Sequence, residues 1–160
     1  MKDYITIAIW CLLATGCAGN RAVTGLAGTI SSLQTHGEVV PLNVATVRQP
    51  STDRNIAYAR DRSDQLNLST IKVNIPANHR PGNIETSSLK PDQRTQFSAS
   101  HYHAIADPRT MIAHLNGELA SRPSKQRELL IFVHGYNNNF AEGLFRNAQI
   151  VHDYGIASVP

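Results

Sequence analysis

The residues best suited to chemistry follow a short apolar run near the C-terminal end of the sequence. Leu129 to Val133 is apolar throughout, and His134, Gly135, Tyr136 and Asn137 come directly after it. Backbone N–H groups that are fixed at a sharp turn stabilise the negative charge that acyl transfer builds on a substrate oxygen, without reorganising. Gly135 allows close backbone approach and unusual dihedral angles. A turn at this position could therefore present backbone amides to such an oxygen. We expect His134 to shape the loop by hydrogen bonding to its backbone rather than to transfer a proton.

Two predicted elements would hold this turn in place. The five apolar residues 129–133 are bounded by polar residues, which is typical of a central strand buried on both faces. A helix follows, because Asn139 and Glu142 have the spacing of a capping box and Gly155 suits a left-handed C-cap. Ile156 to Val159 resembles the start of another strand. Together these elements predict a parallel βαβ unit with a right-handed crossover. The helix has a core stripe of Phe140, Leu144, Ala148 and Val151.

The upstream sequence predicts further strands and one more helix. Polar and apolar residues alternate over Leu42–Arg48 and over Ser69–Ile75, which indicates half-buried strands at an antiparallel edge of the sheet. A short strand is expected within 77–106, since a structureless loop of that length is unusual. Asp107 and Pro108 are typical of a helix start. The apolar stripe predicted for this helix is Met111, Ile112, Leu115 and Leu119.

The segment around the turn resembles a known family. Val133-His134-Gly135 resembles the oxyanion-hole turn of α/β-hydrolases, and the run from His134 to Phe140 is similar to one branch of uncharacterised bacterial hydrolase-like proteins. Residues 42–160 share the resemblance, which implies the N-terminal part of an α/β-hydrolase sheet: antiparallel edge strands, then a parallel βαβ unit, incomplete. The domain would span residues 38–160. Two upstream segments also resemble this branch of the family. They are Val44-Ala45-Thr46 with Arg48, and Val73-Asn74-Ile75-Pro76 followed by His79 and by Pro81-Gly82.

The resemblance also assigns roles to individual residues. It implies that Tyr136 donates one oxyanion-hole amide, with Asn137 beside it, while His134 and Gly135 support the turn. In these hydrolases the nucleophile, acid and histidine follow the turn, and no Gly-x-Ser-x-Gly elbow occurs in this sequence. We therefore expect no triad member here, and all three beyond Pro160. The implied function is ester hydrolysis of an esterase or lipase type, with a small ester as substrate; the alternative is a non-catalytic envelope lipoprotein that uses the scaffold for binding.

Other partners and cofactors are not expected. The net charge is +3, and Arg54, Arg60 and Arg62 alternate with Asp53, Asp61 and Asp64, so we interpret this stretch as a solvated surface rather than a nucleic-acid site. No pair of histidines has a recognised metal-ligand spacing, including His101 with His103. We therefore predict neither a metal nor an organic cofactor.

The first residues have the pattern of an export signal. Lys2 precedes an apolar run from Tyr4 to Ala14, which is too short to span a bilayer as a helix. Leu13 to Cys17 reads Leu-Ala-Thr-Gly-Cys and resembles the lipobox of bacterial lipoproteins. The resemblance implies a signal peptide over 1–16, lipidation of Cys17, and an exported protein anchored in a membrane of the cell envelope. A plain secretory signal and an ordinary buried helix are the alternatives. Residues 17–37, rich in Gly, Ser and Thr, are interpreted as a flexible tether.

Overall fold

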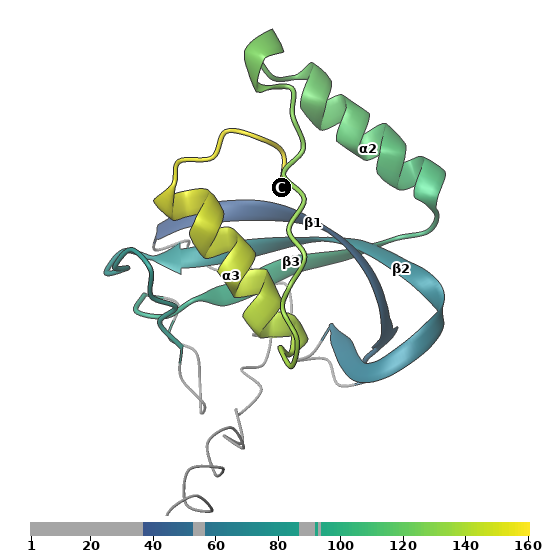
Figure 1. Ribbon diagram of the computed structural model, residues 1–160, viewed down its shortest axis with the longest axis horizontal. Coiled ribbons are helices and arrows are strands. Elements are labelled where there is room, and N and C mark those ends of the chain that lie inside the picture. Colours follow the sequence, from purple (N-terminus) through teal and green to yellow (C-terminus); the bar gives the residue numbers. More distant parts are fainter. Residues whose placement is uncertain (1–36, 53–56, 87–91, 93) are drawn as a thin grey trace, which may run out of the picture.

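The protein is described by a computed structural model over residues 37–52, 57–86, 92 and 94–160, which form a mixed α/β fold (Figure 1). The predicted signal peptide, Cys17 and almost all of the tether lie outside these residues. Three strands form one antiparallel sheet in the order β1-β2-β3. The elements in chain order are β1 (Gly37–Pro50), β2 (Tyr58–Pro76), β3 (Ser98–Ile105), α2 (Pro108–Ala120), a 3₁₀ turn η1 (Ser124–Gln126) and α3 (Phe140–Asp153).

The sheet confirms the strand predictions and explains their alternation. Leu42 of β1 lies opposite Ile71 of β2, and Val73 of β2 lies opposite Ala99 of β3. All four side chains are buried on one face of the sheet, as period-2 alternation requires. The short strand expected within 77–106 is β3. Both long strands extend well beyond their predicted limits, because antiparallel pairing continues through register shifts near Arg48.

Helix α3 covers the buried face of this sheet (Figure 1). Its N-terminus has the predicted capping box: the Asn139 side chain accepts from the Glu142 amide at 2.8 Å, and Glu142 accepts from the Asn139 amide at 2.9 Å. Gly155 follows the helix at φ 57, as predicted. The core therefore sits between α3 and the sheet. Its buried members are Val40, Leu42, Ile71, Val73, Ile75, Phe97, Ala99, Ala141, Leu144, Phe145 and Ala148.

Substitution of Asn139 by alanine is expected to lower the free energy of unfolding by about 1–2 kcal/mol, since the buried side chain caps a helix on which the core depends. Urea denaturation followed by circular dichroism measures the change. Asn116→Ala, in the exposed middle of α2, is the matched control and should be neutral or slightly stabilising. Equal midpoints for the two variants would contradict the capping role.

Helix α2 begins as predicted but buries less of its stripe than expected. Asp107 accepts from the amides of Arg109 and Thr110, and Pro108 occupies the first turn. Of the predicted stripe, Met111 is buried and Ile112 is 56% exposed, so the prediction was wrong for Ile112. Figure 1 shows α2 at the periphery of the fold, so only the side of the helix that carries Met111 is covered and the neighbouring Ile112 stays in solvent. Among the described residues, no helix is both long and apolar enough to cross a membrane.

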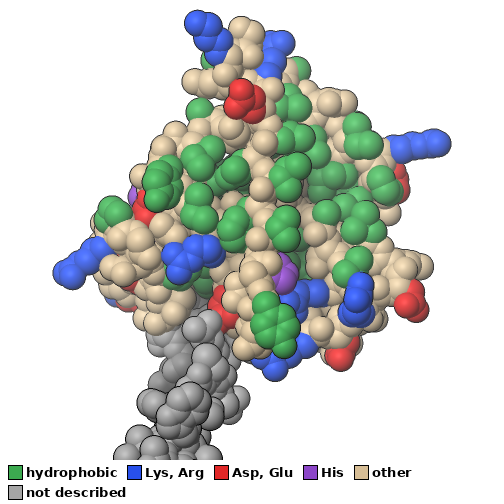
Figure 2. Space-filling view, viewed as in Figure 1, with side chains coloured by type: hydrophobic (Ala, Val, Ile, Leu, Met, Phe, Trp, Pro, Cys, Tyr) green, Lys and Arg blue, Asp and Glu red, His purple; other side chains and the backbone are tan. Residues whose placement is uncertain are grey.

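The structure of residues 129–133 differs from the predicted one more than that of any other segment discussed above. It forms no strand, and Ile131 and Val133 are 82% and 83% exposed rather than buried on both faces. One isolated parallel bridge joins Leu129 to Val159. The described residues therefore contain a single contact of the predicted βαβ unit and no continuous parallel strand. Within the described part of the chain no strand lies along residues 131–133, and the side chains of Ile131 and Val133 remain largely exposed. Figure 2 shows hydrophobic side chains gathered across this face.

The C-terminal residues lie between β1 and this run. The Leu130 amide donates to the Val159 carbonyl at 2.8 Å, and the Asn43 amide of β1 donates to the Pro160 carbonyl at 3.0 Å. Residues 159–160 thus occupy the place of a strand that would join the antiparallel sheet to the 129–133 run.

Candidate functional site

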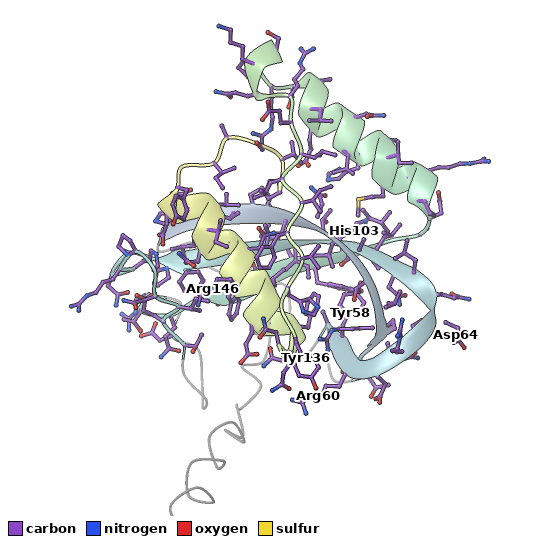
Figure 3. The ribbon with its side chains drawn as sticks, in the orientation of Figure 1. Tyr58, Arg60, Asp64, His103, Tyr136 and Arg146 are labelled. Atoms are coloured by element: carbon purple, nitrogen blue, oxygen red, sulfur yellow. The ribbon has the colours of Figure 1, made fainter. Side chains whose placement is uncertain are left out.

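The predicted oxyanion turn lies in the loop that leads into α3. His134 Nδ1 lies 2.9 Å from the Gly135 carbonyl oxygen, to which a protonated Nδ1 donates. The side chain of Tyr136 is fully exposed at the outer end of the loop (Figure 3). The residues named from the sequence are therefore contiguous and open to solvent, where a ligand can reach their backbone.

The unusual dihedral angle of the turn falls on Asn137 rather than on Gly135. Asn137 has φ 61, whereas the described glycines with positive φ are Gly82 and Gly155. A Cβ added at Gly135 would meet only the Asn138 Nδ2 atom, at 4.0 Å. Gly135, whose residue type allows unusual dihedral angles, therefore has no positive φ in the turn. Asparagine is one of the few non-glycine residues that tolerate this region, because its short amide can hydrogen-bond locally.

Two contacts fix the position of the turn, one with β1 and one with α3. The Arg48 guanidinium of β1 donates to the Asn138 carbonyl at 2.8 Å. Gly143 of α3 lies under His134, since a Cβ built there would come within 3.2 Å of His134 Cβ. The turn is thus fixed both by the sheet and by the helix that follows it. The sequence showed Arg48 as part of the family resemblance but gave no sign of this contact.

A cavity of about 140 Å³ lies behind the turn. Its walls come from β1, from Phe132 and His134, and from the first half of α3. Asn43 and Asn147 line it, and the side-chain oxygen of each is buried without a hydrogen-bond donor among the described residues. Buried polar atoms of this kind are normally hydrogen-bonded, so both oxygens retain an unused capacity to accept a hydrogen bond.

A second cluster, centred on His79, lies at the opposite end of α3. His79 Nδ1 is 2.8 Å from Glu85 Oε2, and its Nε2 is 2.8 Å from Asp153 Oδ1. The side chains of His79 and Asp153 are only 4% and 6% exposed. One imidazole therefore bridges two carboxylates in a nearly buried position, where charged groups require partners.

The environment shifts the pKa values of all three groups toward their charged forms. Burial alone would lower the pKa of His79, but its hydrogen bonds to Glu85 and Asp153 and their negative charges outweigh it and raise the pKa above 6.5. Burial would raise the pKa of Glu85, yet the hydrogen bond from His79 brings it below its usual value. The pKa of Asp153 is likewise lowered, because the amide of Gly82 and the side chains of Gln149 and His79 outweigh desolvation.

Further groups close the cluster from the surface side. The Gly82 amide donates to Asp153 Oδ2 at 2.7 Å, and the Gln149 side chain donates to the same oxygen. The Arg146 guanidinium donates to Gln149 Oε1 at 2.6 Å and to the Gly82 carbonyl at 3.3 Å. Figure 3 shows Arg146 on the side of α3 that faces the segment after β2.

Sequence reasoning did not find this cluster. His79 entered only as part of a family resemblance, and Asp153 received no role. The available signals were the adjacent pair His152-Asp153 and the four-residue spacing of Gln149 and Asp153, which places both on one face of α3. Neither signal points to residue 79, because the pairing depends on where α3 crosses the sheet.

Comparison with known proteins supports the hydrolase resemblance over part of the chain. A family model described as "Alpha/beta hydrolase of unknown function (DUF900)" matches residues 110–160, a narrower span than the resemblance predicted from residue 42 onward. No curated protein and no solved structure matches the chain. The matched span contains the turn, the whole of α3 and the His152-Asp153 pair. Over residues 110–160, the chain is therefore similar to the DUF900 family of α/β-hydrolases of unknown function.

Proposed function

We propose that this chain supplies the oxyanion turn of a membrane-tethered serine hydrolase of esterase or lipase type. The nucleophile, acid and base of that hydrolase come from sequence outside these 160 residues. The observation that carries the proposal is the turn itself, a solvent-open loop that Arg48 and α3 hold in place at the end of an apolar run. The DUF900 match supports a hydrolase-like scaffold for the same residues.

The proposed chemistry uses backbone amides rather than side chains. When a serine oxygen attacks an ester, the carbonyl oxygen becomes an oxyanion, and the amides of Tyr136 and Asn137 donate to it. A left-handed residue within a turn is one arrangement that points successive N–H groups into a shared concavity for an anion, and Asn137 at φ 61 fits this arrangement. The exposed Tyr136 side chain has no role in the step. Its ring is free to contact the substrate.

The geometry around residues 129–133 supports a larger sheet. Residues 159–160 already lie between β1 and this run. The side chains of Ile131 and Val133 are exposed to solvent. A parallel strand on each side, with helices packed on both faces of the sheet, would bury these side chains and make the run a central strand. A nucleophile delivered at the carboxyl end of such a neighbouring strand would lie beside His134 and Gly135. This is the parallel βαβ arrangement that the sequence predicts.

One observation favours the alternative, a lipoprotein that uses the scaffold for binding. The sequence contains no Gly-x-Ser-x-Gly elbow, so an acyl-transfer nucleophile must come from elsewhere. The adjoining coding sequence distinguishes the two functions, because an elbow followed by Asp and His favours the enzyme. An extended protein with a complete triad but no turnover of short activated esters favours binding.

The chain by itself is expected to show no esterase activity above background. An oxyanion turn stabilises a charge that appears only after a nucleophile attacks, and nothing here generates that charge. Turnover of p-nitrophenyl acetate by the purified chain, compared with buffer alone, measures this. Activity that stays with the protein through successive chromatography steps would show that the active site lies elsewhere in the chain.

Cys17 is expected to carry a diacylglycerol in a bacterial host, given the lipobox-like sequence Leu13–Cys17. Mass spectrometry of the membrane fraction should find the mature protein beginning at a lipidated Cys17. Cys17→Ser should abolish processing and anchoring, whereas Cys11→Ser, within the preceding apolar run, should leave both unchanged. An unmodified Cys17 in the wild-type protein would exclude the lipid anchor.

A further inference from the structure

We propose that His79, His152 and Asp153 form a binding site for a divalent transition-metal cation, for which zinc is the best match. One ring nitrogen of each histidine and one carboxylate oxygen of Asp153 lie within 4.8 Å of one another. Two imidazoles and one carboxylate are a ligand set that zinc uses in proteins. The site lies beyond the proposed hydrolase turn, since the turn precedes α3 whereas His152 and Asp153 end it.

Both histidines are oriented as metal ligands usually are. His79 Nδ1 lies 2.8 Å from Glu85 Oε2, and His152 Nδ1 lies 3.0 Å from Glu38 Oε2. A histidine that binds a metal through one nitrogen almost always donates its other N–H to a carboxylate, carbonyl or water, which fixes the tautomer and the ring. With both Nδ1 atoms engaged in this way, the Nε2 atoms are the ones that bind the cation.

The spacing of the proposed ligands suits one cation. His79 Nε2 and Asp153 Oδ1 are 2.8 Å apart, whereas tetrahedral ligands that each lie about 2.1 Å from zinc are about 3.4 Å apart, so a separation of about half an ångström would admit the cation. The centroids of the two imidazole rings are 5.3 Å apart, and the ring planes are inclined at 69°. Asp153 Oδ2 accepts from the Gly82 amide and from Gln149, which leaves Oδ1 for the cation.

An ion pair alone explains only part of this arrangement. A protonated His79 between Glu85 and Asp153 accounts for those three residues. It does not account for a second histidine, with a carboxylate of its own, at the same place. His152 is the more exposed ligand, with 30% of its side chain accessible, so the cation would enter from its side. Three protein ligands leave a coordination position for water.

Cation binding would connect three parts of the fold. Glu38 lies near the start of β1, His79 and Glu85 follow β2, and His152 and Asp153 end α3. A cation that joins them in the folded state and has weaker ligands in the unfolded chain stabilises the fold by mass action. Zinc should therefore raise the melting temperature of the protein.

The test uses the full chain without a histidine tag, treated with a chelator and then dialysed. Titration with zinc chloride in a calorimeter should show one saturable equivalent, and cobalt(II) should give visible absorption typical of nitrogen and oxygen ligands. His152→Ala should weaken zinc binding at least tenfold, and Glu38→Gln, which alters only the carboxylate behind His152, by about tenfold. His114→Ala is the matched control, because His114 is also near a glutamate, at 3.8 Å, but belongs to α2.

Absence of a saturable equivalent in the wild-type chain would overturn the proposal and leave the cluster as an ion pair. Equal zinc affinities for the wild type, His152→Ala and His114→Ala would overturn it too, since binding would then lie elsewhere. If His152→Ala does not fold, the zinc affinity of Glu38→Gln is compared with that of His114→Ala instead. Equal affinities for these two variants would overturn the proposal. None of these outcomes depends on ester hydrolysis, so the site and the proposed function fail separately.

Discussion

Replacing Gly135 with valine in a hydrolase completed around this turn is expected to lower kcat by about 10²–10³-fold, the usual loss when an oxyanion-hole donor is removed. A β-branched side chain at this position would obstruct the approach of the developing oxyanion to the Tyr136 amide. The fold should be unaffected. A Cβ at Gly135 meets only the Asn138 amide nitrogen, at 4.0 Å, and the backbone is not left-handed there.

The measurement is p-nitrophenyl ester turnover by the extended protein, with melting temperature as the readout of folding. Gly117→Val is the matched control, because Gly117 of α2 also has space for a Cβ but lies outside the turn. The control should retain full kcat. An unchanged kcat in Gly135→Val, with wild-type melting, would mean that this turn does not face the reacting oxygen.

Replacing His79 with leucine is expected to lower the free energy of unfolding by about 3–5 kcal/mol, the range found when one partner of a buried ion pair is removed. Leucine fills much of the volume but leaves Glu85 and Asp153 without the positive charge between them. It also loses two hydrogen bonds of 2.8 Å. The edge-to-face contact of His79 with Phe97, at 5.3 Å between centroids, would be lost as well.

Urea denaturation in the presence of a chelator measures this effect without any contribution from bound metal. His114→Leu is the control: its ring is 41% exposed and 3.8 Å from Glu118, so the loss should stay below about 0.5 kcal/mol. If His79→Leu is too unstable to purify, Asp153→Asn preserves the shape of the cluster and should lose less stability. A denaturation midpoint for His79→Leu equal to that of the control would show that the cluster contributes nothing.

Local sequence signals predicted several elements because the interactions behind them are local. The Asn139–Glu142 capping box, the Asp107 cap and the left-handed Gly155 each depend on residues within one helical turn. The alternation of Ile71, Val73 and Ile75 correctly predicted which side of β2 is buried. Such features need no knowledge of the rest of the fold.

Predictions that depended on neighbouring elements were less successful. The apolar character of 129–133 predicted a central strand, yet such burial requires paired strands on both sides and packed layers on both faces of the sheet, and among the described residues the only bridge to this run is at Val159. Ile112 has the spacing of a core residue, but α2 extends away from the sheet. The residue type of Gly135 allows unusual dihedral angles, but the positive φ of the loop lies at Asn137.

Sequence patterns alone were enough to locate two strands of the antiparallel sheet, the caps of both helices, and the His134–Asn137 segment as the candidate turn. The contacts that hold that turn and the groups that surround His79 depend on how the elements pack. The contact between Arg48 and Asn138 spans 90 positions, and that between His79 and Asp153 spans 74. Hydrophobic periodicity determines which face of α3 is buried, but the packing of that face on the sheet determines which distant polar groups come within hydrogen-bonding distance.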